Sequence, residues 1–102
     1  MKRRWLPLAT ALVATGIAGA QSVPPAGRAL AATCANCHGT NGASVGDVPS
    51  LAGMAKDDIV RKMQDFRSGA RPATIMHQLA KGYTDAQIET LAAWFAAQKP
   101  PR

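Results

Sequence analysis

The feature that most restricts this chain is a cluster of three reactive side chains within five positions. Cys34 and Cys37 are the only cysteines among 102 residues, and His38 follows the second one directly. On a helix, positions i, i+3 and i+4 share one face, so all three side chains can reach one flat group. Large apolar side chains are few, and we therefore expect something other than side chains to fill the centre of the fold.

The run Cys34-Ala35-Asn36-Cys37-His38 matches the C-x-x-C-H pattern of c-type haem attachment. Each thiol adds to one vinyl group of the porphyrin edge, and the imidazole then lies under the iron. A domain this small buries little apolar surface, and covalent attachment lets it keep its cofactor nevertheless. The motif predicts one covalent haem c, bound through Cys34 and Cys37, with His38 on the iron.

Three other uses of the two cysteines stay open on the residues alone. A redox-active disulfide is expected in a thioredoxin-like β-α-β context, and no segment alternates convincingly with period two. A zinc site would add His38 and His77 at tetrahedral distances, which the adjacent positions of Cys37 and His38 disfavour. A structural disulfide with an incidental histidine is the third.

The N-terminus has the pattern of a secretory signal peptide. A basic cluster at residues 2–4 precedes an apolar run that ends Ala18-Gly19-Ala20. We predict a signal peptide over 1–20, cleaved after Ala20, a domain over 21–102, and export to the periplasm. The alternative is a retained membrane anchor, although a span needs about 17–25 apolar residues.

Removal of this leader takes away three positive charges and no negative ones, which lowers the formal charge from +6 to +3. No Lys/Arg run remains, so nucleic-acid binding is not expected. The remaining charge fits transient docking on an acidic protein surface, and a merely solvated surface explains it equally well.

Apolar periodicity and turn residues predict an all-α fold with three main helices and a short one. The clearest start signal is a capping box, with Thr84 at the N-cap and Gln87 three positions later. The helices are expected over 26–37, 55–67 and 75–81 and from Thr84 to just before Pro100, with a glycine-rich loop over 39–53.

The second axial ligand of the iron is less strongly indicated than the first. Met76 follows the second long helix, where the chain must cross the far face of the haem, and we predict it as the ligand. A methionine opposite a histidine raises the reduction potential of haem iron. Met54, Met63 and His77 are alternatives, as is an iron with an open position.

At this point the sequence resembles the class I (monohaem) cytochromes c over nearly the whole chain after residue 20. It is most similar to bacterial periplasmic members of the type also found as the haem subunit of flavocytochrome c sulfide dehydrogenase. The stretches that carry the resemblance are 34–38, 48–53, 65–71 and 75–85.

The resemblance implies further residue roles. Pro49 matches a proline whose carbonyl accepts the N–H of the iron-bound histidine, a contact that tunes the ligand; without the resemblance it is an ordinary loop proline. Leu51 is expected to pack on the haem face. Trp94 and Phe95 match the aromatic part of a terminal helix that packs on the first one, as core packing alone would also predict. The resemblance also assigns thioether bonds to Cys34 and Cys37 and the axial positions to His38 and Met76.

An iron whose six positions are all filled has no site for a substrate, so the resemblance implies an electron carrier and not an enzyme. Electrons would pass through an exposed haem edge to a redox protein partner, across a small interface. Five cations are candidates for the rim of this interface, although each could equally well belong to a solvated surface. These are Lys56, Lys62, Arg67, Arg71 and Lys81.

Two versions of this role stay open, a freely diffusing periplasmic carrier and a haem subunit that accepts electrons from a flavoprotein sulfide dehydrogenase. A different class, a haem protein with an open iron that senses gas or reduces peroxide, would require that Met76 does not bind. The electron donor, the acceptor and the reduction potential do not follow from the sequence.

Overall fold

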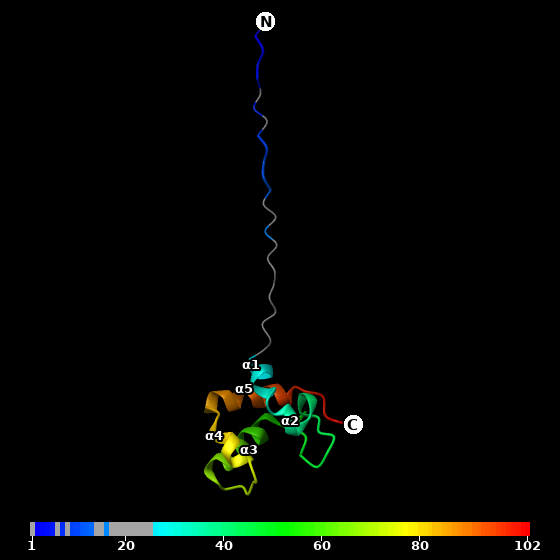
Figure 1. Cartoon of the computed structure of the whole chain (residues 1–102), viewed down its shortest axis with the longest axis vertical. Helices are drawn as coiled ribbons and strands as arrows, with labels where there is room; N and C mark the ends of the chain where they lie inside the picture. The colour runs from blue at the N-terminus through cyan, green and yellow to red at the C-terminus, as the bar shows by residue number, and fades with distance from the viewer. Residues whose placement is uncertain (1, 6, 8, 14–15, 17–25) are drawn as a thin grey trace.

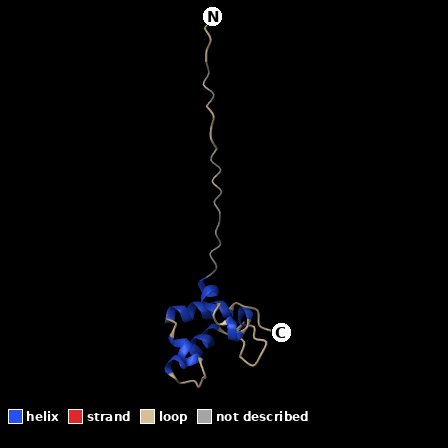
Figure 2. Cartoon of the chain, viewed as in Figure 1, coloured by secondary structure: helices blue, strands red, loops and turns tan. Residues whose placement is uncertain are grey.

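The computed structural model describes residues 2–5, 7, 9–13, 16 and 26–102. The predicted cleavage site after Ala20 lies outside these ranges. Figure 2 shows helices and loops and no strand in the part of the chain that is described, which confirms the predicted all-α class. No helix within those ranges is long and apolar enough to cross a membrane.

The described domain is built around its last helix. α1 packs against α5, and α3 packs against both α4 and α5, so that α5 contacts the first and the middle helices of the described domain (Figure 1). The elements of residues 26–102 are α1 (Ala26–Ala31), α2 (Ala35–His38), the 3-10 helix η1 (Thr40–Gly42), α3 (Lys56–Ser68), α4 (Met76–Lys81) and α5 (Asp85–Ala96).

The prediction of one helix over 26–37 is wrong, because a turn at 32–34 separates α1 from α2. In this turn the N–H of Cys34 donates to the carbonyl three residues back, at 3.0 Å. The hydroxyl of Thr33 also donates to the carbonyl of Leu30, at 3.3 Å. Such local side-chain bonds compete with helix propagation. Cys34 consequently caps a new helix that carries Cys37 and His38.

The longer helices follow their sequence signals closely. The predicted capping box of α5 is present: the hydroxyl of Thr84 accepts the N–H of Gln87 at 3.1 Å, and the Gln87 side chain accepts the N–H of Thr84 at 2.9 Å. α3 ends at Gly69 in a left-handed conformation. Its bounds differ from the predicted 55–67 by one residue at each end.

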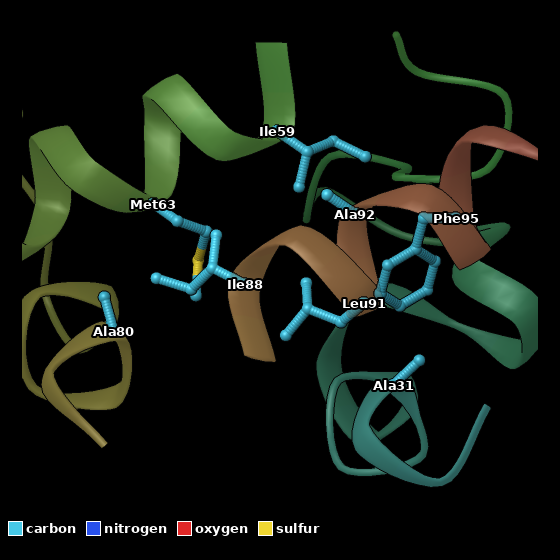
Figure 3. Close-up of a cluster of buried hydrophobic side chains, with 8 residues drawn as sticks. All are labelled: Ala31, Ile59, Met63, Ala80, Ile88, Leu91, Ala92 and Phe95. Carbon is cyan, nitrogen blue, oxygen red and sulfur yellow. The ribbon is translucent and has the colours of Figure 1, made fainter. Parts of the chain in front are cut away.

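The core lies between α3 and α5, and α1 and α4 close its two ends. Figure 3 shows Met63 of α3 projecting toward Ile88 of α5 within this cluster. The largest fully buried side chains are Phe95, Ile88 and Leu91, all from α5. The buried cluster consists of Ala31, Ile59, Met63, Ala80, Ile88, Leu91, Ala92 and Phe95.

The crossing of α1 over α5 depends on a glycine. A Cβ atom on Gly27 would lie 2.8 Å from the Cβ of Trp94 and 2.9 Å from the carbonyl oxygen of Thr90. Real Cβ atoms do not approach neighbours so closely, and therefore only a residue without a side chain allows this helix spacing. The predicted packing of the terminal helix on the first one thus rests on Gly27 as much as on the aromatic pair.

The glycine-rich loop is fixed on α5 through Gly42. Its carbonyl accepts the N–H groups of Leu51 and Ala52 at 2.8 and 3.1 Å. Its φ is 80°, and a Cβ atom there would lie 2.8 Å from Cδ1 of Phe95. The end of the loop, at Leu51 and Ala52, is therefore held close to the ring of Phe95 in the core.

Replacement of Gly42 by alanine should destabilise the protein, because the new methyl group meets Phe95 and the backbone must keep a left-handed φ. We expect a loss of about 1–3 kcal/mol in the free energy of unfolding, the usual cost of overpacking. Chemical denaturation of the purified protein measures it. Gly46→Ala is the matched control, since nothing lies within 4 Å of a Cβ there. Equal effects of both variants would contradict the role of Gly42.

Candidate functional site

A cavity of about 470 Å³ opens beside the core. This volume lies within the range of about 300–1,000 Å³ that is typical of sites for organic ligands. Its wall comes from the segments 33–38, 48–54 and 71–79 and from the face of α3 that carries Ile59, Met63 and Phe66. Most of this wall is apolar, as a site for a large flat apolar group requires.

All of the site residues predicted from the sequence line this one cavity. They come from three separate regions of the chain, namely the turn and helix at 34–38, the end of the glycine-rich loop, and the start of α4. These residues are Cys34, Cys37, His38, Pro49, Leu51 and Met76.

The two cysteines lie at the cavity wall as free thiols, with Cys34 half-buried and Cys37 exposed. Burial raises the pKa of the Cys34 thiol, and a hydrogen bond with Thr33 opposes part of this change. A redox-active cysteine needs a lowered pKa, because the thiolate is the nucleophile. The environment of Cys34 therefore does not favour a thioredoxin-like disulfide.

The zinc alternative is not supported by the geometry. Cys34, Cys37, His38 and His77 all belong to the described part of the chain. Within that part, no three or more His, Cys, Asp or Glu side chains gather so that they could hold a metal ion.

The orientation of His38 is fixed by a backbone contact. Its Nδ1 lies 2.6 Å from the carbonyl oxygen of Pro49. A carbonyl can only accept, so Nδ1 carries the proton and donates it, and the lone pair is on Nε2. Pro49 itself is held by the loop: the hydroxyl of the next residue, Ser50, accepts the N–H of Ser44 at 2.9 Å. His38 is thus prepared to offer Nε2 as a ligand on the cavity side.

Three methionines line the cavity, and their surroundings differ. Met63 is only 7% exposed and belongs to the core. The sulfur of Met54 accepts a weak hydrogen bond from the Lys62 ammonium at 3.8 Å. Met76 is the first residue of α4 and has no such contact. His77, its neighbour, is absent from the cavity wall, and its Nδ1 is buried without a hydrogen-bond partner.

The hydroxyls of Thr33 and Tyr83 form a contact that the sequence did not indicate. They lie 2.8 Å apart and join segments separated by 50 positions. Both residues line the cavity. No local pattern in the sequence links Thr33 with Tyr83, so only the tertiary arrangement reveals the pair.

The five cations expected at a docking rim do not behave alike. Lys56 and Arg67 form ion pairs with Glu89 and Asp85, at 2.8 and 2.6 Å. Arg67 also donates to the carbonyl of Tyr83 at 2.7 Å, which ties the end of α3 to the start of α5. Lys62 and Arg71 line the cavity, and Lys81 is exposed at the end of α4.

Removal of the phenolic hydroxyl in Tyr83→Phe should lower the free energy of unfolding by about 0.5–1.5 kcal/mol, the net worth of one neutral hydrogen bond. Thr33→Val should cost a similar amount. Denaturation of both single variants and of the double variant gives the coupling energy between the two sites. Strictly additive effects would show that the two hydroxyls do not bond to each other.

Comparison with known proteins places these observations in a wider context. A sequence model of the cytochrome c family matches residues 25–99. The cytochrome subunit of sulfide dehydrogenase from Chlorobaculum tepidum is 39% identical over 85 residues, which cover 79% of this chain and 77% of that protein.

Two further relatives are longer than this chain. Cytochrome c4 from Pseudomonas aeruginosa is 35% identical over 100 residues, or 97% of this chain and 50% of that protein. The thiosulfate dehydrogenase electron acceptor from Stutzerimonas stutzeri is 36% identical over 73 residues, or 70% of this chain and 34% of that protein. The chain therefore spans half or less of the length of these two relatives.

Proposed function

The chain belongs to the cytochrome c family, and on that basis we propose that Cys34, Cys37 and His38 hold its haem c in the cavity beside α3. It is an electron-transfer protein and not itself an enzyme, as its relatives named as cytochromes and electron acceptors indicate. The observation that carries the assignment of the site is the convergence of the whole C-x-x-C-H motif on one largely apolar cavity.

The residues present fit this cofactor. The thiols of Cys34 and Cys37 both lie at the largely apolar wall, where they can reach the edge of a porphyrin. The Pro49 carbonyl fixes the tautomer of His38, so that Nε2 can bind a metal without a further change. When bound, the haem supplies an iron that alternates between Fe(II) and Fe(III) and so carries one electron.

The other residues of the site control the surroundings of the iron. Ile59, Met63 and Phe66 form an apolar wall that excludes water, and exclusion of solvent is one of the means by which a protein sets a haem potential. Leu51 covers a further part of the wall. We assign the second axial position to the sulfur of Met76, because the sulfur of Met54 is already in contact with Lys62 and Met63 is packed in the core.

Replacement of Met76 by alanine should abolish the Fe–S charge-transfer band of the oxidised protein and lower its reduction potential, since a methionine ligand raises that potential. Absorbance spectra and a redox titration of the haem-loaded protein measure both. Met54→Leu, Met63→Leu and His77→Gln are the controls, and each should keep the band. A wild-type protein without this band at neutral pH would overturn the Met76 assignment and favour an open iron.

The partner of the carrier is proposed from the surface next to the cavity and from the relatives. Ile75 and Leu79 line the cavity and are still 55% and 46% exposed, which gives an apolar patch at its edge. We propose that a redox protein docks there. The similarity to a cytochrome subunit of sulfide dehydrogenase favours a flavoprotein sulfide dehydrogenase subunit as one such partner, and a freely diffusing carrier is the second candidate.

We further propose that residues 1–20 act as an export signal and that the domain over 21–102 works in the periplasm. Purification of the tagged protein from periplasmic extract at low salt tests both the location and the partner. Absorbance of the tagged protein reports haem and flavin together. Haem with stoichiometric flavin identifies a subunit of a flavoenzyme, whereas haem alone identifies a diffusing carrier. Recovery only from the cytoplasm would contradict export.

A further inference from the structure

The cavity wall contains two segments that are separate in the chain and carry the two predicted iron ligands. The segment 33–54 supplies His38 to the wall, and we call it the histidine wall. The segment 71–83 supplies Met76, and we call it the methionine wall. An iron that keeps both ligands requires that the spacing between these two walls stay constant.

A single polar contact joins the two walls directly. Within residues 26–102, the pair of hydroxyls on Thr33 and Tyr83 is the only hydrogen bond or ion pair between the histidine wall and the methionine wall. Thr33 is exposed and Tyr83 is half-buried, so the contact lies at the edge of the cavity and not in the core. Its position is that of a clasp between the two ligand-bearing segments.

The methionine wall has little other support. Its helix α4 has six residues, which is too short for a helix to be stable on its own. Ala80 is the buried residue of α4, whereas Ile75 and Leu79 remain exposed. Elements with few buried apolar contacts open locally at a low cost in free energy. A contact at the end of α4 therefore contributes a large share of what keeps this wall closed.

The direction of the bond follows from the other contact of Thr33. Its hydroxyl donates to the carbonyl of Leu30 at 3.3 Å, and a hydroxyl has one proton to donate. Thr33 is therefore the acceptor, and Tyr83 donates to it at 2.8 Å. The carbonyl of Tyr83 in turn accepts from Arg67 at 2.7 Å. Tyr83 is thus fixed to α3 through its backbone and to the turn before Cys34 through its side chain.

We propose that Tyr83 is a positioning residue whose bond to Thr33 latches the methionine wall to the histidine wall and so limits the access of small ligands to the iron. The proposal rests on the proposed function, because it requires haem in the cavity and Met76 as the second axial ligand. With the latch closed, the iron keeps both protein ligands and only transfers electrons. When the methionine wall opens, the vacated position can take a small nitrogen or oxygen ligand.

The test uses imidazole as the probe and the oxidised, haem-loaded protein. Imidazole coordinates ferric haem iron only when the methionine sulfur has left, and loss of the Fe–S charge-transfer band reports its binding. The apparent affinity is proportional to the open fraction. Loss of one hydrogen bond from the closed form should therefore make Tyr83→Phe bind imidazole about two- to tenfold more tightly than the wild type.

Variants of Thr33 test whether the two hydroxyls act together. Thr33→Val should also strengthen imidazole binding, and Thr33→Ser, which keeps the hydroxyl, should restore the wild-type affinity. The double variant Thr33→Val/Tyr83→Phe should match Thr33→Val, because the bond can be lost only once. Fully additive effects on the binding free energy would contradict a shared latch.

Thr90→Val is the matched control. The hydroxyl of Thr90 donates to the carbonyl of Ala86 within α5, at 2.9 Å, and Thr90 is not part of the cavity wall. This variant therefore loses a hydroxyl and a hydrogen bond as Thr33→Val does, and it should keep the wild-type affinity for imidazole. An equal gain of affinity in Thr90→Val would show that general destabilisation, and not the latch, controls access to the iron.

The rate of binding separates opening of the wall from new contacts with the probe. At saturating imidazole the observed rate equals the rate at which the sulfur leaves the iron, and Tyr83→Phe should raise this limiting rate. Tighter binding with an unchanged limiting rate would overturn the proposal, as would unchanged affinity in a variant that keeps the Fe–S band. A wild-type protein without haem absorbance or without this band would instead overturn the proposed function, so the two failures are distinguishable.

Discussion

The packing of α5 on the rest of the chain supports both the fold and the cavity. Its side chains Ile88, Leu91 and Phe95 are the largest fully buried ones, and Leu91 also reaches the cavity wall. α1 lies against one part of α5 and α3 against another. α5 therefore holds α1, which leads into the turn and helix with the two cysteines, and α3, which forms the apolar wall, on one common support.

Phe95 connects this packing to His38, the proposed iron ligand. The ring leaves no room for a side chain on Gly42, and the carbonyl of Gly42 binds the end of the loop at Leu51. This arrangement fixes the position of the nearby Pro49, whose carbonyl contacts the Nδ1 atom of His38. A core residue without contact to His38 thus supports the loop whose carbonyl fixes the tautomer of this proposed ligand.

Features that depend on local chemistry could be predicted from the sequence, and those that depend on close approach could not. The capping box of α5 and the stripe of Ile88, Leu91 and Phe95 follow from spacing alone. The C-x-x-C-H motif predicted the haem cofactor because few other kinds of site use that spacing of cysteines and histidine. The pairing of Thr33 with Tyr83 joins segments that are 50 positions apart, and no local pattern marks it.

The break in the first helix was missed for a related physical reason. Alanine-rich residues favour a continuous helix over 26–37, but propensity does not include the competing bond from Thr33 to the carbonyl of Leu30. Likewise, the sequence made Lys62 and Arg71 candidates for the rim of a docking surface or for a solvated face, whereas the structure places both at the cavity wall. The sign of a charge is evident from the sequence, but the direction in which it points is not.

The shortness of α1 and α2 affects the order in which the molecule is assembled. With six and four residues, both are well below the length of about 12–15 residues at which a helix is even marginally stable on its own. α1 persists because α5 packs against it, and α2 follows α1 after a turn of three residues. We therefore expect Cys34 and Cys37 to stay in an irregular, solvated segment until α5 docks on α1, so that a reactant as wide as a porphyrin can approach both sulfurs before the cavity closes around it.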